Sequence, residues 1–109
     1  MATKKSFFNV IEDSGNKAGY SNGAWERTVL FRKDNIRFKI SIRCESHESQ
    51  SYARLYKWTE QKGFECVIRK QPQRDYNIKC AHHNENEMYK GIFDPIVKDL
   101  MEIAEKTFF

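Results

Sequence analysis

The clearest pattern in this chain is a strict alternation of apolar and polar residues over residues 36–44. The apolar positions are Ile36, Phe38, Ile40, Ile42 and Cys44. Because successive side chains of a strand point to opposite faces, this period of two predicts a half-buried antiparallel strand. Residues 25–33 are also rich in strand-forming residues, and Asp34-Asn35 between the two segments is typical of a hairpin turn.

Further strands are expected on both sides of this hairpin. Residues 51–59 have the composition of a strand, and residues 64–70 and 76–80 alternate again. In residues 64–70 the alternation predicts one outward set, namely Glu65, Val67 and Arg69. The short apolar run at residues 7–11 is either a sixth strand or an N-terminal anchor. The sequence therefore predicts a meander of five or six antiparallel strands.

Near the C-terminus the apolar spacing changes to three and four residues, which predicts an amphipathic helix over residues 86–107. Asp94-Pro95 interrupts this stripe. Either Asp94 caps a new helix that begins at Pro95, or one kinked helix runs through. In both cases the side chains expected to face the sheet are Ile96, Val97, Leu100, Ile103 and Ala104.

These elements predict an α+β fold, an antiparallel five- or six-stranded meander with one C-terminal helix packed on one face. The 109 residues, fifteen of them aromatic, suit a single domain over residues 1–109 with one core. Within it we expect an N-terminal segment and mobile loop over residues 1–24, the sheet over 25–81 and then the helix.

The cysteines and the apolar runs give an expectation for the compartment. Three cysteines without a CxxC motif cannot complete a disulfide framework and favour a reducing, cytoplasmic setting. No apolar run approaches the ~20 residues of a membrane span, and no signal-peptide core follows the first residues. We therefore expect no membrane partner.

The net charge of +4 is unevenly distributed along the chain. Residues 1–26 are neutral, residues 27–74 carry a balance of +7, and residues 75–109 carry −3. Such asymmetry indicates a polyanionic partner, oppositely charged surfaces that steer self-association, or an ordinary solvated surface.

The predicted strands place many of these cations on the sheet face that the helix leaves open. If Ile36 to Ile42 face the helix, Arg37, Lys39 and Arg43 lie on the other face, and Arg69 joins them from residues 64–70. For residues 51–59 two orientations remain. With Ala53 and Leu55 under the helix, the open face gains Tyr52, Arg54, Tyr56 and Trp58; in the reverse orientation these rings fill the core.

A basic and aromatic sheet face suits single-stranded nucleic acid, because cations neutralise phosphates and flat rings stack on unpaired bases. We expect a non-enzymatic binding domain in which cations contact phosphates and two rings stack on bases. The nucleic-acid-binding residues would be Arg37, Lys39, Arg43, Arg54, Tyr56, Trp58 and Arg69. The alternative is a protein-interaction module, such as a homodimer, small inhibitor or adaptor, that uses the same face or a sheet edge.

A third class is a small zinc- or thiol-dependent enzyme, but its sequence support is weak. The candidate ligands are Cys44, His47, Cys80 and His82. Their spacing matches no standard zinc site, and cysteines of the inward parity behave as small apolar residues. No catalytic residue can be singled out, because nucleotide-cradling and hydrolase motifs are absent from the sequence. We expect neither a cofactor nor a metal.

Overall fold

The computed structural model describes residues 7–14, 17–18, 25–45, 48–78 and 91–109. Its strands are β1 (Asn9–Asp13), β2 (Lys17–Ala18), β3 (Trp25–Lys33), β4 (Ile36–Cys44), β5 (Tyr52–Thr59) and β6 (Gly63–Lys70). Its helices are a 3-10 turn (Glu48–Gln50), α1 (Pro72–Asp75) and α2 (Asp94–Phe108).

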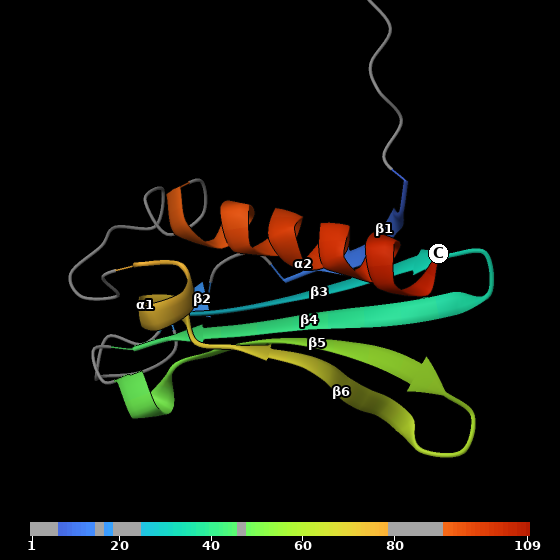
Figure 1. Ribbon diagram of the computed structural model, residues 1–109, viewed down its shortest axis with the longest axis horizontal. Coiled ribbons are helices and arrows are strands. Elements are labelled where there is room, and N and C mark those ends of the chain that lie inside the picture. The colour runs from blue at the N-terminus through green and yellow to red at the C-terminus, as the bar shows by residue number, and fades with distance from the viewer. Residues whose placement is uncertain (1–6, 15–16, 19–24, 46–47, 79–90) are drawn as a thin grey trace, which may run out of the picture.

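The strands form a single antiparallel sheet in the order β1-β3-β4-β5-β6, and β2 pairs with β3. Helix α2 crosses one face of this sheet (Figure 1). The predicted α+β class, with an antiparallel meander and one C-terminal helix, is therefore confirmed. The short N-terminal segment combines both alternatives: residues 9–13 form the edge strand β1, and Phe8 just before it is buried in the core.

The central hairpin follows the alternation in the sequence. β3 and β4 occupy residues 25–33 and 36–44 as predicted, and Asp34 takes a positive φ of 55° in the two-residue turn between them. Every second residue of β4 from Phe38 to Cys44 is buried. The core lies between this face of the sheet and α2, where the rings of Phe31 and Phe38 stack with centroids 5.2 Å apart.

Helix α2 buries the predicted apolar stripe but begins differently from the prediction. Ile96, Val97, Leu100 and Ala104 are buried, and Ile103 is partly buried against the same cluster. The helix begins at Asp94, and no side chain caps its N-terminus. The carboxylate of Asp94 accepts instead from Arg27 of β3. The predicted capping role of Asp94 is therefore wrong, because a nearly buried guanidinium recruits its carboxylate.

The predicted strand at residues 76–80 is not formed in its described part. Pro72 begins the short helix α1, and the side chain of Gln71 accepts from the backbone N–H of Arg74. Asn77 has a positive φ of 53°, which breaks an extended course. Tyr76 donates to Asp99 of α2 over 2.7 Å. Burial and this hydrogen bond raise the pKa of Tyr76. The segment thus packs against the helix instead of extending the sheet.

Two other expectations concern regions that are partly outside the described residues. The predicted loop before β3 contains the short strand β2, which pairs with Trp25 and Glu26, and its other residues from 15 to 24 lie outside the described part. The helix predicted from residue 86 is described from Gly91 onward, with a π-helical turn over residues 91–93 leading into α2.

The cysteines differ from the expectation. Cys44 is disulfide-bonded, whereas Cys66 is a free thiol. A disulfide is at odds with the predicted reducing, cytoplasmic setting, since disulfides persist mainly in oxidising compartments. In the described parts of the chain, no helix has the length and apolar character needed to cross a bilayer.

Candidate functional site

Strand β5 decides which side chains line the sheet face opposite α2, here called the open face. Ala53 and Leu55 are fully buried towards the helix. Of the two orientations left open by the sequence, the structure therefore has the one that turns the aromatic parity outward. The open-face residues of β5 are Tyr52, Arg54, Tyr56 and Trp58.

Strand β4 supplies the cations that its alternation predicts. Arg37, Lys39 and Arg43 lie opposite open-face residues of β3 and β5 in the register. Lys39 stands between the apolar Leu30 on one side and Tyr56 on the other. The centre of the open face therefore combines a cation with an apolar and an aromatic neighbour.

The outward set predicted for residues 64–70 is partly wrong, because β5 and β6 shift register between Leu55 and Tyr56. Before this bulge Phe64 and Cys66 face Trp58 and Tyr56 on the open face, and Glu65 lies opposite Lys57 on the helix side. Beyond it Arg69 lies opposite Arg54 on the open face, as predicted. An extra residue in one strand inverts the side-chain parity, which strict alternation cannot anticipate.

Two pairs of arginines lie directly opposite each other on the open face. Arg32 of β3 is the cross-strand partner of Arg37, and Arg54 is the partner of Arg69. Like charges directly opposite are destabilising in a sheet. Among the residues that the structure describes, none of these four arginines has a carboxylate within ion-pair distance. Each pair therefore concentrates positive charge that no described side chain neutralises.

Arg43 differs from the other cations of the open face. Its guanidinium bonds to both carboxylate oxygens of Glu45, at 3.0 and 3.2 Å, and also pairs with Glu26 of β3. The hydrogen bonds to Glu45 and the charge of Glu26 raise the pKa of Arg43. Because two carboxylates already occupy its donors, Arg43 has much weaker support as a phosphate contact than the sequence implied.

Aromatic rings hold the cations at the centre of the open face. The ammonium of Lys39 lies 4.5 Å from the ring centroid of Tyr56 and 4.9 Å from that of Phe64. The guanidinium of Arg54 lies 4.2 Å from the ring centroid of Tyr52. Trp58 packs edge-on against Phe64 and remains 39% exposed. Trp58 thus offers the most available stacking surface, while Tyr56 also positions Lys39.

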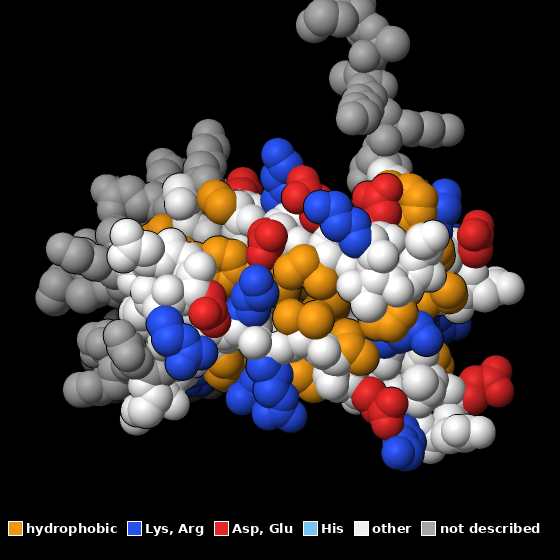
Figure 2. Space-filling model, viewed as in Figure 1, with side chains coloured by type: hydrophobic (Ala, Val, Ile, Leu, Met, Phe, Trp, Pro, Cys, Tyr) orange, Lys and Arg blue, Asp and Glu red, His pale blue; other side chains and the backbone are white. Residues whose placement is uncertain are grey.

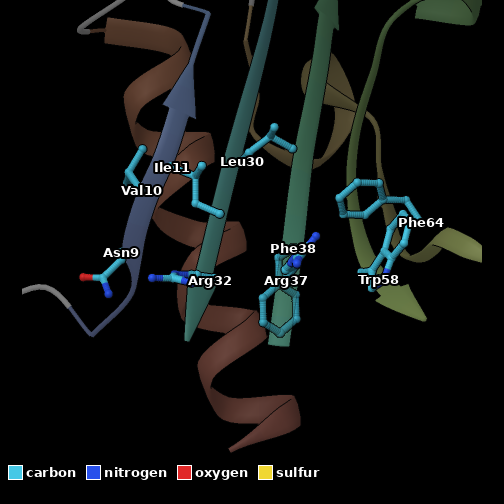
Figure 3. A pocket seen from close by; sticks show the side chains of 9 residues that line it. All are labelled: Asn9, Val10, Ile11, Leu30, Arg32, Arg37, Phe38, Trp58 and Phe64. Atoms are coloured by element: carbon cyan, nitrogen blue, oxygen red, sulfur yellow. The ribbon is translucent and has the colours of Figure 1, made fainter. Parts of the chain in front are cut away.

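A trough of about 560 Å³ crosses the open face near the β3–β4 and β5–β6 hairpins. Figure 3 looks onto this face with α2 behind the sheet; Ile11 and Leu30 lie on one side, Trp58 and Phe64 on the other. Both arginines line the trough: Arg37 lies between these apolar walls, and Arg32 extends from β3 towards Asn9 of β1. A neighbouring hollow of about 400 Å³ shares both arginines and Trp58 and brings Asp34 and Glu60 to its rim. The trough therefore joins two cations to apolar walls, with carboxylates only in the adjoining hollow.

The side of the molecule that carries α2 has a different charge pattern. Figure 2 shows acidic and basic side chains interspersed over this helix. Its exposed polar residues include Lys98, Glu102, Glu105 and Lys106. Uncompensated positive charge is thus a property of the open face and does not extend over this side.

The metal candidates are not brought together in the described structure. Cys44, a weak candidate, is disulfide-bonded, so in this structure it has no thiolate to offer a metal. His47, Cys80 and His82 lie outside the described residues. Within the described ranges there is no group of three metal-ligating side chains.

Two residues of the site were missed by the sequence reasoning. Arg32 could have been found, because the Asp34-Asn35 turn sets the β3–β4 register and places Arg32 opposite Arg37. Phe64 could not, because its outward direction depends on the bulge in the β5–β6 pair. The residues predicted to bind nucleic acid do lie on that face, namely Arg37, Lys39, Arg43, Arg54, Tyr56, Trp58 and Arg69.

Comparisons with models of protein families, with curated proteins and with solved structures found no match for this chain. Any functional conclusion therefore rests on the chemistry of the open face.

Proposed function

We propose that this protein binds single-stranded nucleic acid across the open face, as a binding domain without catalysis. The observation that carries the proposal is the presence of two opposed arginine pairs, Arg32–Arg37 and Arg54–Arg69, with no described carboxylate partner. A polyanion that contacts both pairs would neutralise the repulsion within each. The counterions released from the polyanion on binding would supply most of the affinity.

The spacing of the two pairs favours an extended anion over a single small one. Arg37 and Ser41, the neighbour of Arg54, are four residues apart on β4, which is about 13 Å at ~3.3 Å per residue. The pairs are also displaced by two strands, or about 10 Å across the sheet at ~4.8 Å per strand. A nucleic acid backbone that crosses the face diagonally would place successive phosphates near both.

The side chains between the arginine pairs favour unpaired bases. Lys39 and the ring of Tyr56 lie on this diagonal, and the rings of Trp58 and Phe64 lie to one side of it, level with Arg37. Each base that stacks on an aromatic ring contributes ~1–3 kcal/mol, and bases inside a duplex cannot reach such a ring. We therefore expect single strands to bind at least about tenfold more tightly than duplexes of the same sequence.

Fluorescence anisotropy with a labelled oligothymidine, titrated at several salt concentrations, tests this proposal. If three to five cations contact phosphates, log Kd should rise by about 2 to 3.5 for each decade of salt. The double variant Arg54→Gln/Arg69→Gln should weaken binding and reduce this slope by about 1.4, since each contact on a single strand contributes ~0.7. Absence of binding at low salt would contradict the proposal.

The matched control is Lys98→Gln, which also removes a cation but lies exposed on α2, across the molecule from the open face. It should leave both the affinity and the salt slope close to those of the unmodified protein. An equal loss in the control and in the arginine variant would indicate nonspecific attraction by net charge and would also contradict the proposal.

A specific observation keeps a protein partner as the second candidate. The edge strands carry exposed apolar side chains: Val10 and Ile11 on β1 are 53% and 54% exposed, and Val67 on β6 is exposed as well. Unpaired strand edges with apolar residues favour pairing with another chain. This candidate predicts a stable dimer by light scattering, or a partner that remains bound at high salt, together with weak oligonucleotide binding.

A further inference from the structure

The trough has an unusual chemical asymmetry among its polar groups. It is lined by Arg32 and Arg37, whose guanidiniums are donors without acceptor capacity. The carboxylates Asp34 and Glu60 line the adjoining hollow and not the trough. Among the described residues that line the trough, Asn9 has the side chain that can accept a hydrogen bond, through its amide oxygen. Backbone carbonyls can accept as well.

The walls of the trough suit a flat ring. Ile11 and Leu30 stand on one side, and Trp58 and Phe64 on the other (Figure 3). The volume of about 560 Å³ falls within the ~300–1,000 Å³ typical of small-molecule sites. A single nucleotide can therefore enter with its base between the aliphatic and the aromatic wall.

We infer that the trough takes one unpaired guanine of the bound strand, an inference that rests on the proposed function. Guanine presents two adjacent acceptors, O6 and N7, which match the two parallel donors of a guanidinium. In an unpaired adenine the amino group flanks the acceptor on both the Watson–Crick and the Hoogsteen edge, and thymine has no two adjacent acceptors. Cytosine has adjacent acceptors at N3 and O2, but its amino group lies beside them and needs an acceptor of its own. A trough lined by guanidinium donors therefore favours guanine over the other three bases.

The strand order assigns different roles to the two arginines. Arg37 is on β4, the immediate neighbour of β5, so it lies nearer to Trp58 than Arg32 does. A base stacked on Trp58 thus presents its edge to Arg37. Arg32, one strand further away, is then placed for the adjoining phosphate.

The test compares oligothymidines that carry one central substitution: guanine, adenine, cytosine, hypoxanthine or 7-deazaguanine. A single bidentate contact predicts that the guanine oligonucleotide binds about 5- to 100-fold more tightly than oligothymidine. Hypoxanthine keeps O6 and N7 and should bind like guanine. 7-Deazaguanine lacks N7 and should lose most of the gain.

Two charge-preserving variants separate recognition from electrostatics. Arg37→Lys keeps the charge but lacks the planar fork, so the guanine preference should fall to about twofold or less while the salt slope stays unchanged. Arg32→Lys is the matched control and should keep the preference. Equal binding of all five oligonucleotides, a guanine preference that survives in Arg37→Lys, or an adenine preference abolished by Asn9→Ala would each overturn the inference.

This design distinguishes the failure of the inference from that of the proposed function. Salt-sensitive binding of every oligonucleotide without base preference would overturn the guanine site and leave single-strand binding intact. Absence of binding by plain oligothymidine and by all substituted oligonucleotides would contradict both.

Discussion

Arg27 shows how one residue joins three elements of this fold. Its side chain is 5% exposed, on the helix side of β3, between β1 and the start of α2. It donates to both carboxylate oxygens of Asp13, at 3.1 and 2.7 Å, and to Asp94. Burial alone would lower the pKa of Arg27, but these two acids raise it, so the charge is retained inside the protein.

Replacing Arg27 with Ala should therefore destabilise the protein strongly. Removing one partner from a buried ion pair costs ~3–5 kcal/mol. Because Asp13 and Asp94 keep some exposure, 28% and 44%, we expect the lower end, a loss of about 3 kcal/mol in the free energy of unfolding, measured by urea denaturation.

Arg74→Ala is the control for this substitution. Arg74 also forms an ion pair, with Asp75, but its side chain is 74% exposed. An exposed pair contributes ~0–1 kcal/mol, so the free energy of unfolding should change by less than about 1 kcal/mol. Similar effects of the two substitutions would contradict the structural role assigned to Arg27.

Among the elements, the β5–β6 hairpin has the strictest conformational requirement. Gly63 begins β6 with a φ of +69°, and a β-carbon added there would lie 3.4 Å from the ring of Trp58. This packing helps place Trp58 beside Phe64, and both rings line the trough. The hairpin thus couples a turn requirement to the geometry of the open face.

Gly63→Ala should cost about 1–2 kcal/mol of stability, because L-residues are strained in the left-handed region. Gly91→Ala is the matched control, since an added β-carbon there meets no atom within 4 Å. In a helical turn alanine should be neutral or stabilise by up to ~1 kcal/mol. Thermal unfolding of both variants checks this prediction, and a Gly63→Ala protein as stable as the unmodified chain would contradict it.

The elements also show how far the sequence could predict the structure. Strands with one buried face and short turns, such as β3 and β4, were located residue by residue because their alternation is set by burial. The segment at Tyr76 was predicted wrongly, because its alternation reflects contacts with α2 and not with a neighbouring strand. Likewise, the outward position of Phe64 depends on a bulge that is visible only in the pairing of two strands.

The candidate site could be predicted only in part, for the same physical reason. Residues of one alternating strand, Arg37 and Lys39, were placed on the correct face by local pattern alone. Whether Tyr56 and Trp58 face outward depended on which side of β5 packs under α2, a tertiary choice. That Arg43 is occupied by Glu26 and Glu45 depends on side-chain contacts that a single strand does not encode.

The uneven distribution of charge along the sequence gives the folded molecule two sides that differ in charge. The basic middle of the chain forms the sheet, and the acidic C-terminal part supplies α2 on the opposite side. On the open face the positive charges of the two arginine pairs reinforce each other, whereas acidic and basic side chains are interspersed over α2. Such a distribution steers an anionic partner towards the open face.

The most direct test of single-strand binding at the open face uses the two tryptophans as reporters. In Trp25→Phe the remaining tryptophan, Trp58, lies on the open face; in Trp58→Phe the remaining Trp25 packs against the core. Titration with a single-stranded oligonucleotide should quench the emission of Trp58 in a saturable, salt-sensitive manner and leave that of Trp25 nearly unchanged. Binding that quenches Trp25 but not Trp58 would contradict the account.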